Sequence, residues 1–464
     1  MKYVSTRGDA PVLDFEGVTL AGLAADGGLY VPERWPTMSR DEIAALAGLD
    51  YVETAVRVMA PFAAGSVTED ELRALCRTAY GNFAHEAVTP LVQLDARNWL
   101  MELFHGPTLA FKDVALQLLG RFFARFLEGS DRKLTVIGAT SGDTGSAAIN
   151  GLAGLHQVEV FMLHPEGRIS EVQRRQMTTV IAPNVHNLAI AGSFDDAQRH
   201  VKRMFGDPEF RGGLDLSAVN SINWARLMAQ VVYYFYTAVR LGAPERQVAF
   251  SVPTGNFGDV FAGYVAAKMG LPVAKLIVAT NVNDILHRAL SAGDYSAGDV
   301  TPTDAPSMDI QVSSNFERLL FDLAGRRGED LGQMMAGFER DRRLTLPANM
   351  RTGASLFTSA RVDKEAMTAA MRTALAKYGQ LIDPHTAIGL AAAHAVDLPP
   401  ETPVVTLATA HPAKFGDAVE AATGQRPVLP ARMGDLMSRE ERFDTIGGDY
   451  EDFAAHIRAH AGRA

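Results

Sequence analysis

The sequence has little cysteine: Cys76 is the single one among 464 residues. A disulfide within the chain needs two cysteines, and a zinc site built from cysteines needs several, so both are excluded. We interpret Cys76 as a small buried apolar residue rather than a reactive group. No metal site is predicted.

Long apolar runs and blocks of positive charge are also missing. No run of about 18 apolar residues occurs, so no transmembrane helix is expected. The opening stretch, MKYVSTRGDAPVLDF, lacks the apolar segment of a secretory signal. The formal net charge of -10, without a cluster of Lys and Arg, argues against nucleic acid or an anionic membrane as partner. We expect a cytoplasmic protein, and the oligomeric state stays open between monomer and homodimer.

The length is sufficient for two or three domains. Helical patterns dominate the first part, in the segments SRDEIAALAGL, YVETAVRVMAPFA and TEDELRALCRTAYGNF. Ser39 and Thr68 stand at the N-cap positions of two of them, each followed by acidic residues. Residues 1–95 are therefore predicted to form a mostly helical N-terminal domain.

The pattern changes after this part. Short apolar runs rich in Val, Leu, Ile and Thr alternate with helical patterns, at 133–139, 158–163, 247–253, 275–280 and 403–409. This alternation predicts βαβ units whose parallel sheets are covered on both faces by helices, an α/β fold. The stretch 295–312 is predicted to be a long loop, and the tail after about residue 425 to be peripheral helix and turn.

One lysine stands inside an apolar helical pattern, HGPTLAFKDVALQLLG, residues 105–120. A polar stripe recurs every four residues, at Asp113, Gln117, Arg121 and Arg125. Lys112 instead shares a face with Leu116, Leu119 and Phe123, so a helix turns its ammonium toward the core. The alternative is a lysine at the edge of the core whose ammonium reaches water.

Three loops that follow predicted strands carry small and polar residues. The first, after 133–139, holds Thr140, Ser141, Gly142, Asp143 and Thr144 and leads into a helix of small residues. Free N–H groups at a helix start attract anions, although an ordinary turn has the same composition. Its glycine spacing matches neither a P-loop nor a dinucleotide-binding loop.

The second loop, TGNFGD, offers a row of N–H donors for a phosphate at Gly255, Asn256, Phe257 and Gly258. The third contains Thr409, with His411 and Lys414 just after it. A structural turn remains the alternative for each. Taken together, a dry lysine and a phosphate site on an α/β scaffold indicate pyridoxal phosphate, held by the lysine as a Schiff base.

At these residues the chain resembles a known family. Seven motifs occur in the order LAADGGLYVPE, HGPTLAFKD, ATSGDTG, NSINWARLMAQ, SVPTGNFGD, ATNVND and TAHPAKF. They are similar to those of threonine synthases among the fold-type II pyridoxal-phosphate enzymes, in the bacterial and fungal branch with a long N-terminal region. The resemblance implies two open, twisted, mainly parallel sheets covered by helices. It divides the chain into the helical domain 1–95, a large cofactor-binding domain (96–130 and 240–425), a small α/β domain (131–239) and C-terminal peripheral helices (426–464).

The resemblance also assigns roles. Lys112 matches the Schiff-base lysine, the loop Gly255 to Asp259 matches the one that holds the cofactor phosphate, and Thr409 matches the hydroxyl that faces the pyridine nitrogen. The loop Thr140 to Thr144 matches the one that receives the substrate α-carboxylate. Asp143 stands where related dehydratases and sulfhydrylases have Asn beside the cofactor phenolic oxygen. A carboxylate and a phenolate repel each other unless one carries a proton, so the role of Asp143 is left open.

The implied reaction converts O-phospho-L-homoserine and water to L-threonine and phosphate. Thr108 is interpreted as the N-cap of the helix, which places Lys112 in about the first turn. Burial and the helix dipole are therefore expected to lower the pKa of Lys112, which frees its amine. The leaving phosphate needs cations and donors, and the candidates are Asn223, Arg226, Asn315 and Arg318, with Ser221, Lys414 and His105 as further ones. Each Arg is equally well explained as part of an ion pair, and for His385 a structural role is favoured.

Two alternatives to this function remain at this stage. A phospho-lyase would keep the cofactor and release 2-oxobutanoate, ammonia and phosphate from the same substrate. A non-catalytic binding protein on the same fold would be expected to have lost the lysine or the phosphate loop, and both are present.

Overall fold

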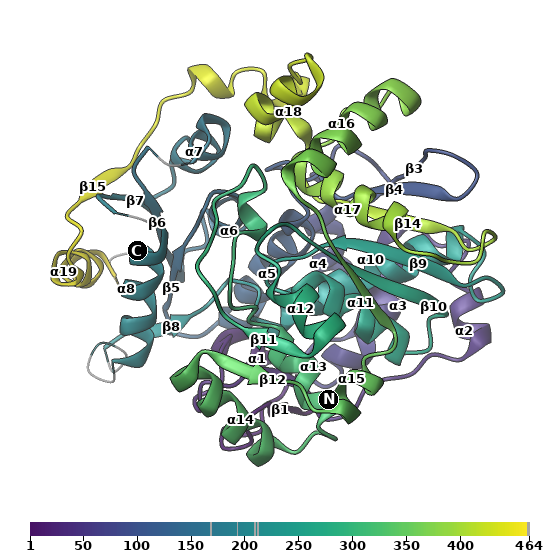
Figure 1. Ribbon diagram of the computed structural model, residues 1–464. Coiled ribbons are helices and arrows are strands. Elements are labelled where there is room, and N and C mark those ends of the chain that lie inside the picture. Colours follow the sequence, from purple (N-terminus) through teal and green to yellow (C-terminus); the bar gives the residue numbers. More distant parts are fainter. Residues whose placement is uncertain (168, 193, 208–209, 211–212, 462–464) are drawn as a thin grey trace.

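The computed structural model describes residues 1–167, 169–192, 194–207, 210 and 213–461. Two separate open sheets dominate the described part (Figure 1). The larger has six strands in the order β13 (Phe357–Arg361), β10 (Val273–Thr280), β9 (Val248–Pro253), β14 (Val404–Ala408), β4 (Asn98–Glu102) and β3 (Leu91–Gln93). All neighbours in it are parallel except β3, which runs antiparallel to β4.

The smaller sheet is parallel throughout. Its order is β15 (Asp444–Ile446), β7 (Val185–Ile190), β6 (Val158–Pro165), β5 (Leu134–Ala139) and β8 (Asp215–Ser217). In Figure 1 the yellow C-terminal segment leaves α18 (Gly416–Thr423) and crosses to β15 at the edge of this sheet. The tail was predicted to contain only helix and turn; β15 corrects this, because a three-residue edge strand is specified by its partner β7 and not by its own sequence.

The five apolar runs identified in the sequence all form strands, which confirms the α/β prediction. Helices connect and cover them. Beyond those introduced elsewhere, they are α7 (Glu171–Thr178), α8 (Phe194–Gly206), α12 (Ile285–Ala292), α13 (Phe316–Leu323), α14 (Gly328–Asp341), α15 (Ala348–Gly353), α16 (Lys364–Tyr378), α17 (Pro384–Ala395) and α19 (Tyr450–His460). The predicted loop 295–312 contains the short 3-10 turn η1 (Pro306–Met308) and is otherwise irregular after β11 (Asp294–Ser296), which pairs with β12 (Arg343–Thr345).

The N-terminal region is mostly helical, as predicted. It contains α1 (Phe15–Ala21), α2 (Arg40–Ala44), α3 (Tyr51–Ala63) and α4 (Glu69–Tyr80), and an antiparallel pair of β1 (Tyr3–Ser5) and β2 (Tyr30–Pro32). Ser39 and Thr68 are confirmed as N-caps, and each forms a reciprocal capping box with the Glu three residues later. Cys76 is buried in α4.

The helix α10 (Trp224–Arg240) joins this region to the rest of the molecule. Its residues 224–239 are all buried, and it packs against α3, against α5 (Lys112–Leu127) and against α11 (Gly258–Lys268). The N-terminal region therefore shares its hydrophobic core with the larger sheet. The four-part division of the chain, which places α10 with the small sheet, stays a prediction.

The start of α5 differs from the prediction in two ways. Thr108 was expected to be the N-cap, but the helix begins at Lys112, and Thr108 donates through its N–H (2.8 Å) and hydroxyl (2.7 Å) to the Asp113 carboxylate. The polar stripe is also only partly exposed, because Asp113 and Gln117 are buried. Gln117 is covered by α6 (Asp143–Leu152), where its amide donates to Asn150 Oδ1.

The helices of the described residues were also compared with the length and hydropathy that a membrane span requires, and none of them meets both.

Candidate active site

A cavity of about 730 Å³ lies where the two sheets present the carboxyl ends of their strands. Thr140 follows β5 of the smaller sheet, while Thr254 and Thr409 follow β9 and β14 of the larger sheet, and all three residues line the cavity. The carboxyl ends of parallel strands are the usual place for ligands in open α/β sheets. All three loops singled out in the sequence therefore reach one cavity.

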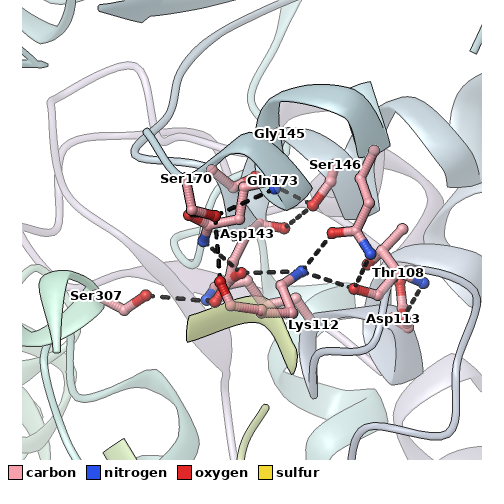
Figure 2. A network of polar contacts seen from close by, with 12 residues as sticks. Thr108, Lys112, Asp113, Asp143, Gly145, Ser146, Ser170, Gln173 and Ser307 are labelled. Atoms are coloured by element: carbon pink, nitrogen blue, oxygen red, sulfur yellow. Dashed lines mark hydrogen bonds and ion pairs between the residues drawn. The ribbon is translucent and has the colours of Figure 1, made fainter. Parts of the chain in front are cut away.

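Lys112 is the first residue of α5 and lines this cavity. The beginning of α5 is attached to the larger sheet, because the N–H of Phe111 donates at 2.8 Å to the carbonyl oxygen of Thr409, the residue after β14. The residue is buried, as its position in the apolar pattern predicted, with 8% of its surface exposed. Nζ lies 3.3 Å from Asp143 Oδ2 (Figure 2).

The surroundings of Lys112 favour its neutral amine. Burial lowers the pKa of Lys112, Asp143 raises it, and the positive charges of Lys414 and Arg226 lower it further, so that the pKa lies below the ordinary lysine value. A neutral amine is the form that attacks an aldehyde. The lowered pKa therefore increases the fraction of Lys112 that carries a neutral amine.

Asp143 is the first residue of α6 and lies between two lysines. Its Oδ1 is 3.0 Å from Lys414 Nζ and accepts from Gln173 Nε2 at 2.9 Å, and its Oδ2 faces Lys112 and, at 3.5 Å, the Ser307 hydroxyl (Figure 2). Burial raises the pKa of Asp143, but Lys414, Lys112 and the Gln173 hydrogen bond lower it by more, to well below its usual range. The carboxylate is therefore charged, and the ammonium group of Lys414 balances its charge.

A glycine makes the Gln173 contact possible. Gly142 has φ 132°, and a Cβ there would come within 2.5 Å of the Gln173 side chain. Thr140 shapes the same loop, because its hydroxyl oxygen accepts from the N–H groups of Gly142 (2.9 Å) and Gly145 (2.8 Å). Ser141 and Thr144 line the cavity.

The loop from Gly255 to Gly258 is fastened through its carbonyl groups. Gly255 O accepts from the Ser313 hydroxyl at 2.8 Å, and Asn256 O accepts from Asn315 Nδ2 at 3.0 Å and from Asn315 N at 3.1 Å. Phe257 has φ 63° and caps α11. The N–H groups of a first helical turn lack acceptors within the helix, so this end of α11 at the cavity suits an anion such as the cofactor phosphate.

Asp259 is the second residue of α11 and also lines the cavity, but Oδ1 of its carboxyl group faces α10. Its Oδ1 accepts from the hydroxyls of Tyr233 (2.5 Å) and Tyr234 (3.0 Å), two residues of α10 that sequence reasoning missed. Burial raises the pKa of Asp259 to about 6, against the lowering effect of the two tyrosines and Lys112. The tyrosine pair in VVYYFY was the available signal, and its hydroxyls explain how a carboxyl group sits beside a phosphate site without facing the phosphate.

Two of the candidates for the leaving phosphate line the cavity, Arg226 and Ser221, and Arg226 is the one that carries a charge. It is 4% exposed, and its Nη1 donates to Val219 O at 2.8 Å. Its Nε is buried and has no hydrogen-bond partner within the described part of the chain. Burial lowers the pKa of Arg226 to about 10. Because Arg226 lines the cavity, its guanidinium is placed to bind an anionic ligand there.

The other three candidates lie behind the wall. Asn223 caps α10 by accepting from Ala225 N and donates to the backbone oxygens of Thr19 and Ala218. Arg318 is fully buried; it donates to Tyr30 O at 3.0 Å, to Ile222 O at 2.6 Å and to Asn315 Oδ1. Since their polar groups are already engaged by the protein, the geometry favours a supporting role for them over substrate contact.

Several further residues complete the cavity. Lys202 and Arg342 line it from α8 and from the end of α14, and no motif in the sequence had marked them. His385 lines it as well; its Nε2 accepts from Ser307 N at 3.3 Å and its Nδ1 lies 2.6 Å from Asp383 Oδ2. His105 instead pairs with Glu102 at 2.8 Å. No cluster of His, Cys, Asp or Glu among the described residues has the arrangement of a metal site.

Comparisons with known proteins agree with this site. The family models described as "Threonine synthase N terminus", "Pyridoxal-phosphate dependent enzyme" and "Threonine synthase, C-terminal" match residues 2–80, 83–410 and 386–457. The chain is 53% identical to the threonine synthase of Pseudomonas aeruginosa, over 100% of this chain and 99% of that one. The chain belongs to the threonine synthase family.

Other members of the threonine synthase family are similar over the same length. The Saccharomyces cerevisiae threonine synthase is 42% identical, with 96% of this chain and 95% of that one covered. Among solved structures, the pyridoxal-phosphate-bound threonine synthase of Brucella melitensis superposes with a TM-score of 0.96 at 51% identity, covering 100% of both chains. The yeast threonine synthase structure follows with 0.93 at 40% identity, covering 100% and 99%.

These findings confirm the family, the fold class and the function predicted from the sequence, a pyridoxal-phosphate-dependent lyase of threonine biosynthesis. The expected cofactor is confirmed as well. The residues of the site fit that cofactor: a buried amine, a helix N-terminus for its phosphate and a hydroxyl at Thr409 all line one cavity. The roles of individual site residues remain predictions.

Proposed function

We propose that this cavity converts O-phospho-L-homoserine and water to L-threonine and phosphate, with pyridoxal phosphate held by Lys112 and by the loop Gly255 to Asp259. The observation that supports this most directly is the dry amine of Lys112 at the same cavity as the N-terminus of α11. When bound, the cofactor supplies a conjugated ring that stabilises negative charge on the substrate carbons. The uncharged hydroxyl group of Thr409 would then lie beside the pyridine nitrogen of the cofactor.

The substrate carries two anionic groups, and the cavity has separate donors for each. The loop Thr140 to Thr144, at the N-terminus of α6, receives the α-carboxylate through backbone N–H and hydroxyl groups. Arg226, a buried guanidinium that lines the cavity, binds the phosphate that leaves, and Lys202 and Arg342 add positive charge. This placement orients the substrate between Lys112 and the phosphate cations.

Lys112 is the group that moves protons. With substrate bound to the cofactor, the Lys112 amine would remove protons at Cα and Cβ and return one at Cγ. The Cγ–O bond would break as phosphate departs. Water would supply the hydroxyl at Cβ, its remaining proton would go to the phosphate, and Lys112 would return a proton to Cα. The burial of Lys112 and Asp143 keeps bulk water from competing for these transfers.

Product analysis tests the proposal. Purified enzyme with O-phospho-L-homoserine in ¹⁸O-labelled water should give threonine with one labelled oxygen, detected by mass spectrometry, and an equal amount of inorganic phosphate. The phospho-lyase alternative predicts 2-oxobutanoate and ammonia as the main products, and finding them would overturn the proposal. Lys112→Ala should abolish turnover and the visible absorbance of the bound cofactor, while far-UV circular dichroism stays unchanged.

A further inference from the structure

A second lysine in the site is buried more deeply than Lys112. Lys414, in the 3-10 turn η2 (Pro412–Phe415), is 0% exposed. Its ammonium group donates hydrogen bonds to Thr108 O at 2.6 Å and to Gln176 Oε1 at 2.8 Å, and it forms an ion pair with Asp143 Oδ1 at 3.0 Å. By contrast, the ammonium position of Lys112 has the single oxygen of Asp143 at 3.3 Å. One lysine of the pair is thus fully coordinated and the other is not.

The coordination of Lys414 is rigid. The carbonyl oxygen of Lys414 accepts from the Ser170 hydroxyl, and its N–H donates to His411 O. Both backbone polar groups of Lys414 are therefore hydrogen-bonded. Gln176 of α7 donates with its other atom, Nε2, to the same Thr108 O that Lys414 contacts. The loop before α5, helix α7 and the turn after β14 therefore meet at this ammonium group.

Asp143 is the carboxylate that both lysines share. A buried carboxylate with one ammonium neighbour stabilises that neighbour in its charged form, which here would hold Lys112 as an ion pair. With Lys414 on its other oxygen, the carboxylate keeps a permanent counter-charge whatever the state of Lys112. The positive charge of Lys414 also repels a positive charge on Lys112.

We propose that Lys414 is the fixed counter-cation of Asp143 and a positioning residue for Lys112: it satisfies the carboxylate so that the Lys112 amine stays free for the aldehyde. The proposal rests on the proposed function of Lys112. The same arrangement leaves no unpaired buried carboxylate once Lys112 is committed to the cofactor. The other charged or titratable groups around this pair are Arg226, Asp113, Asp259 and His385 with its partner Asp383.

The test measures the protonation midpoint of Lys112 in apoenzyme. Acetic anhydride acylates only neutral amines, so the pH dependence of Lys112 acetylation, followed by peptide mass spectrometry, reports this midpoint without cofactor. Lys414→Met keeps the length and apolar packing of the side chain and removes the charge. We expect the midpoint to rise by about one unit, and the capture of pyridoxal phosphate at neutral pH to be roughly tenfold slower.

A second variant makes the test independent of the folding of Lys414→Met. Asp143→Asn removes the charge that needs balancing, so it should lower the midpoint of Lys112 and, combined with Lys414→Met, should bring the midpoint back toward the wild-type value. An unchanged midpoint in folded Lys414→Met, or a raised midpoint in Asp143→Asn, overturns the inference. If wild-type Lys112 takes up no pyridoxal phosphate at all, the proposed function itself fails, which is a distinct result.

Discussion

Gly120 of α5 and Gly151 of α6 are in direct backbone contact: a Cβ on Gly120 would lie 2.1 Å from Gly151 O. A Cβ on Gly151 would in turn lie 2.5 Å from Leu116 O. The two helices begin with Lys112 and Asp143, so this close approach sets the distance between the amine and the carboxylate. Only glycine allows backbones to approach so closely.

Gly120→Ala should therefore disturb both stability and the site. The added methyl meets a backbone carbonyl that cannot turn aside, and overpacking of this kind costs about 1–3 kcal/mol of unfolding free energy. Affinity for pyridoxal phosphate, measured by absorbance titration of apoenzyme, should fall as well. Gly337→Ala in α14 is the matched control, because nothing lies within 4 Å of the new methyl group. This substitution should raise the free energy of unfolding by at most about 1 kcal/mol. Equal effects of the two substitutions would contradict this account.

Asn315→Ala should loosen the phosphate loop. The substitution removes the donor to Asn256 O and leaves Arg318 without one of its acceptors in a fully buried place. A buried group left without its partner costs about 1–3 kcal/mol, so stability in chemical denaturation and affinity for pyridoxal phosphate should both fall. The exposed Asn349→Ala serves as control. A variant that binds the cofactor normally but has a raised KM would instead support the direct substrate contact predicted from the sequence.

Arg226→Met should act on the substrate. The loss of a charge-assisted hydrogen bond to phosphate is worth about 1.5–3 kcal/mol, which corresponds to a rise of KM for O-phospho-L-homoserine by roughly tenfold or more. Inhibition by inorganic phosphate should weaken in parallel, while the absorbance spectrum of the bound cofactor stays the same. Arg318→Met gives the comparison: its effect should appear as lower stability. A normal KM in Arg226→Met would remove Arg226 from the phosphate site.

Asp259 should make stability depend on pH. Burial raises its pKa to about 6, above the value of 3.8 that applies without the protein environment, so the folded state binds the proton more tightly than the unfolded state. Protonation of Asp259 therefore stabilises the folded state, and this stabilisation is fully present below the pKa of the unfolded state. It is lost as the pH rises through about 6, which lowers the free energy of unfolding by roughly 3 kcal/mol. The stability of wild-type apoenzyme relative to Asp259→Asn should fall between pH 4 and pH 7 in urea denaturation. A constant difference across that range would show that the carboxyl group is not protonated in the folded state.

Local features of the fold were predictable because their causes lie within a few residues. The capping boxes at Ser39 and Thr68 need only a hydroxyl and a Glu three positions later. Buried parallel strands need a short run of apolar residues, and the five runs seen in the sequence became strands. The edge strands β13 and β15 were missed because they contain polar residues and depend on a neighbouring strand for their hydrogen bonds.

The candidate site was predictable to the same extent. The loops at 140, 255 and 409 were singled out because they follow predicted strands and carry small and polar residues, and in the structure they line one cavity. Helical spacing, however, did not show which of the two candidates Asn223 and Arg226 reaches the phosphate site, because residues three apart lie on one face of a helix. Asn223 turns back to cap its own helix, while the guanidinium of Arg226 reaches the cavity, and this difference depends on which backbone oxygens each side chain meets.

By itself the sequence determined the family, the cofactor and the dry position of Lys112, because ordered motifs and helical periodicity are properties of neighbouring residues. Only the tertiary structure decided the electrostatics of that lysine. Asp143 begins α6, which follows a strand of the smaller sheet, and Lys414 lies in η2, which follows a strand of the larger sheet. Their charges interact because the fold buries both side chains and brings Asp143 Oδ1 within 3.0 Å of Lys414 Nζ. The strength of a charge interaction depends on distance and burial, and neither can be obtained from separation along the chain.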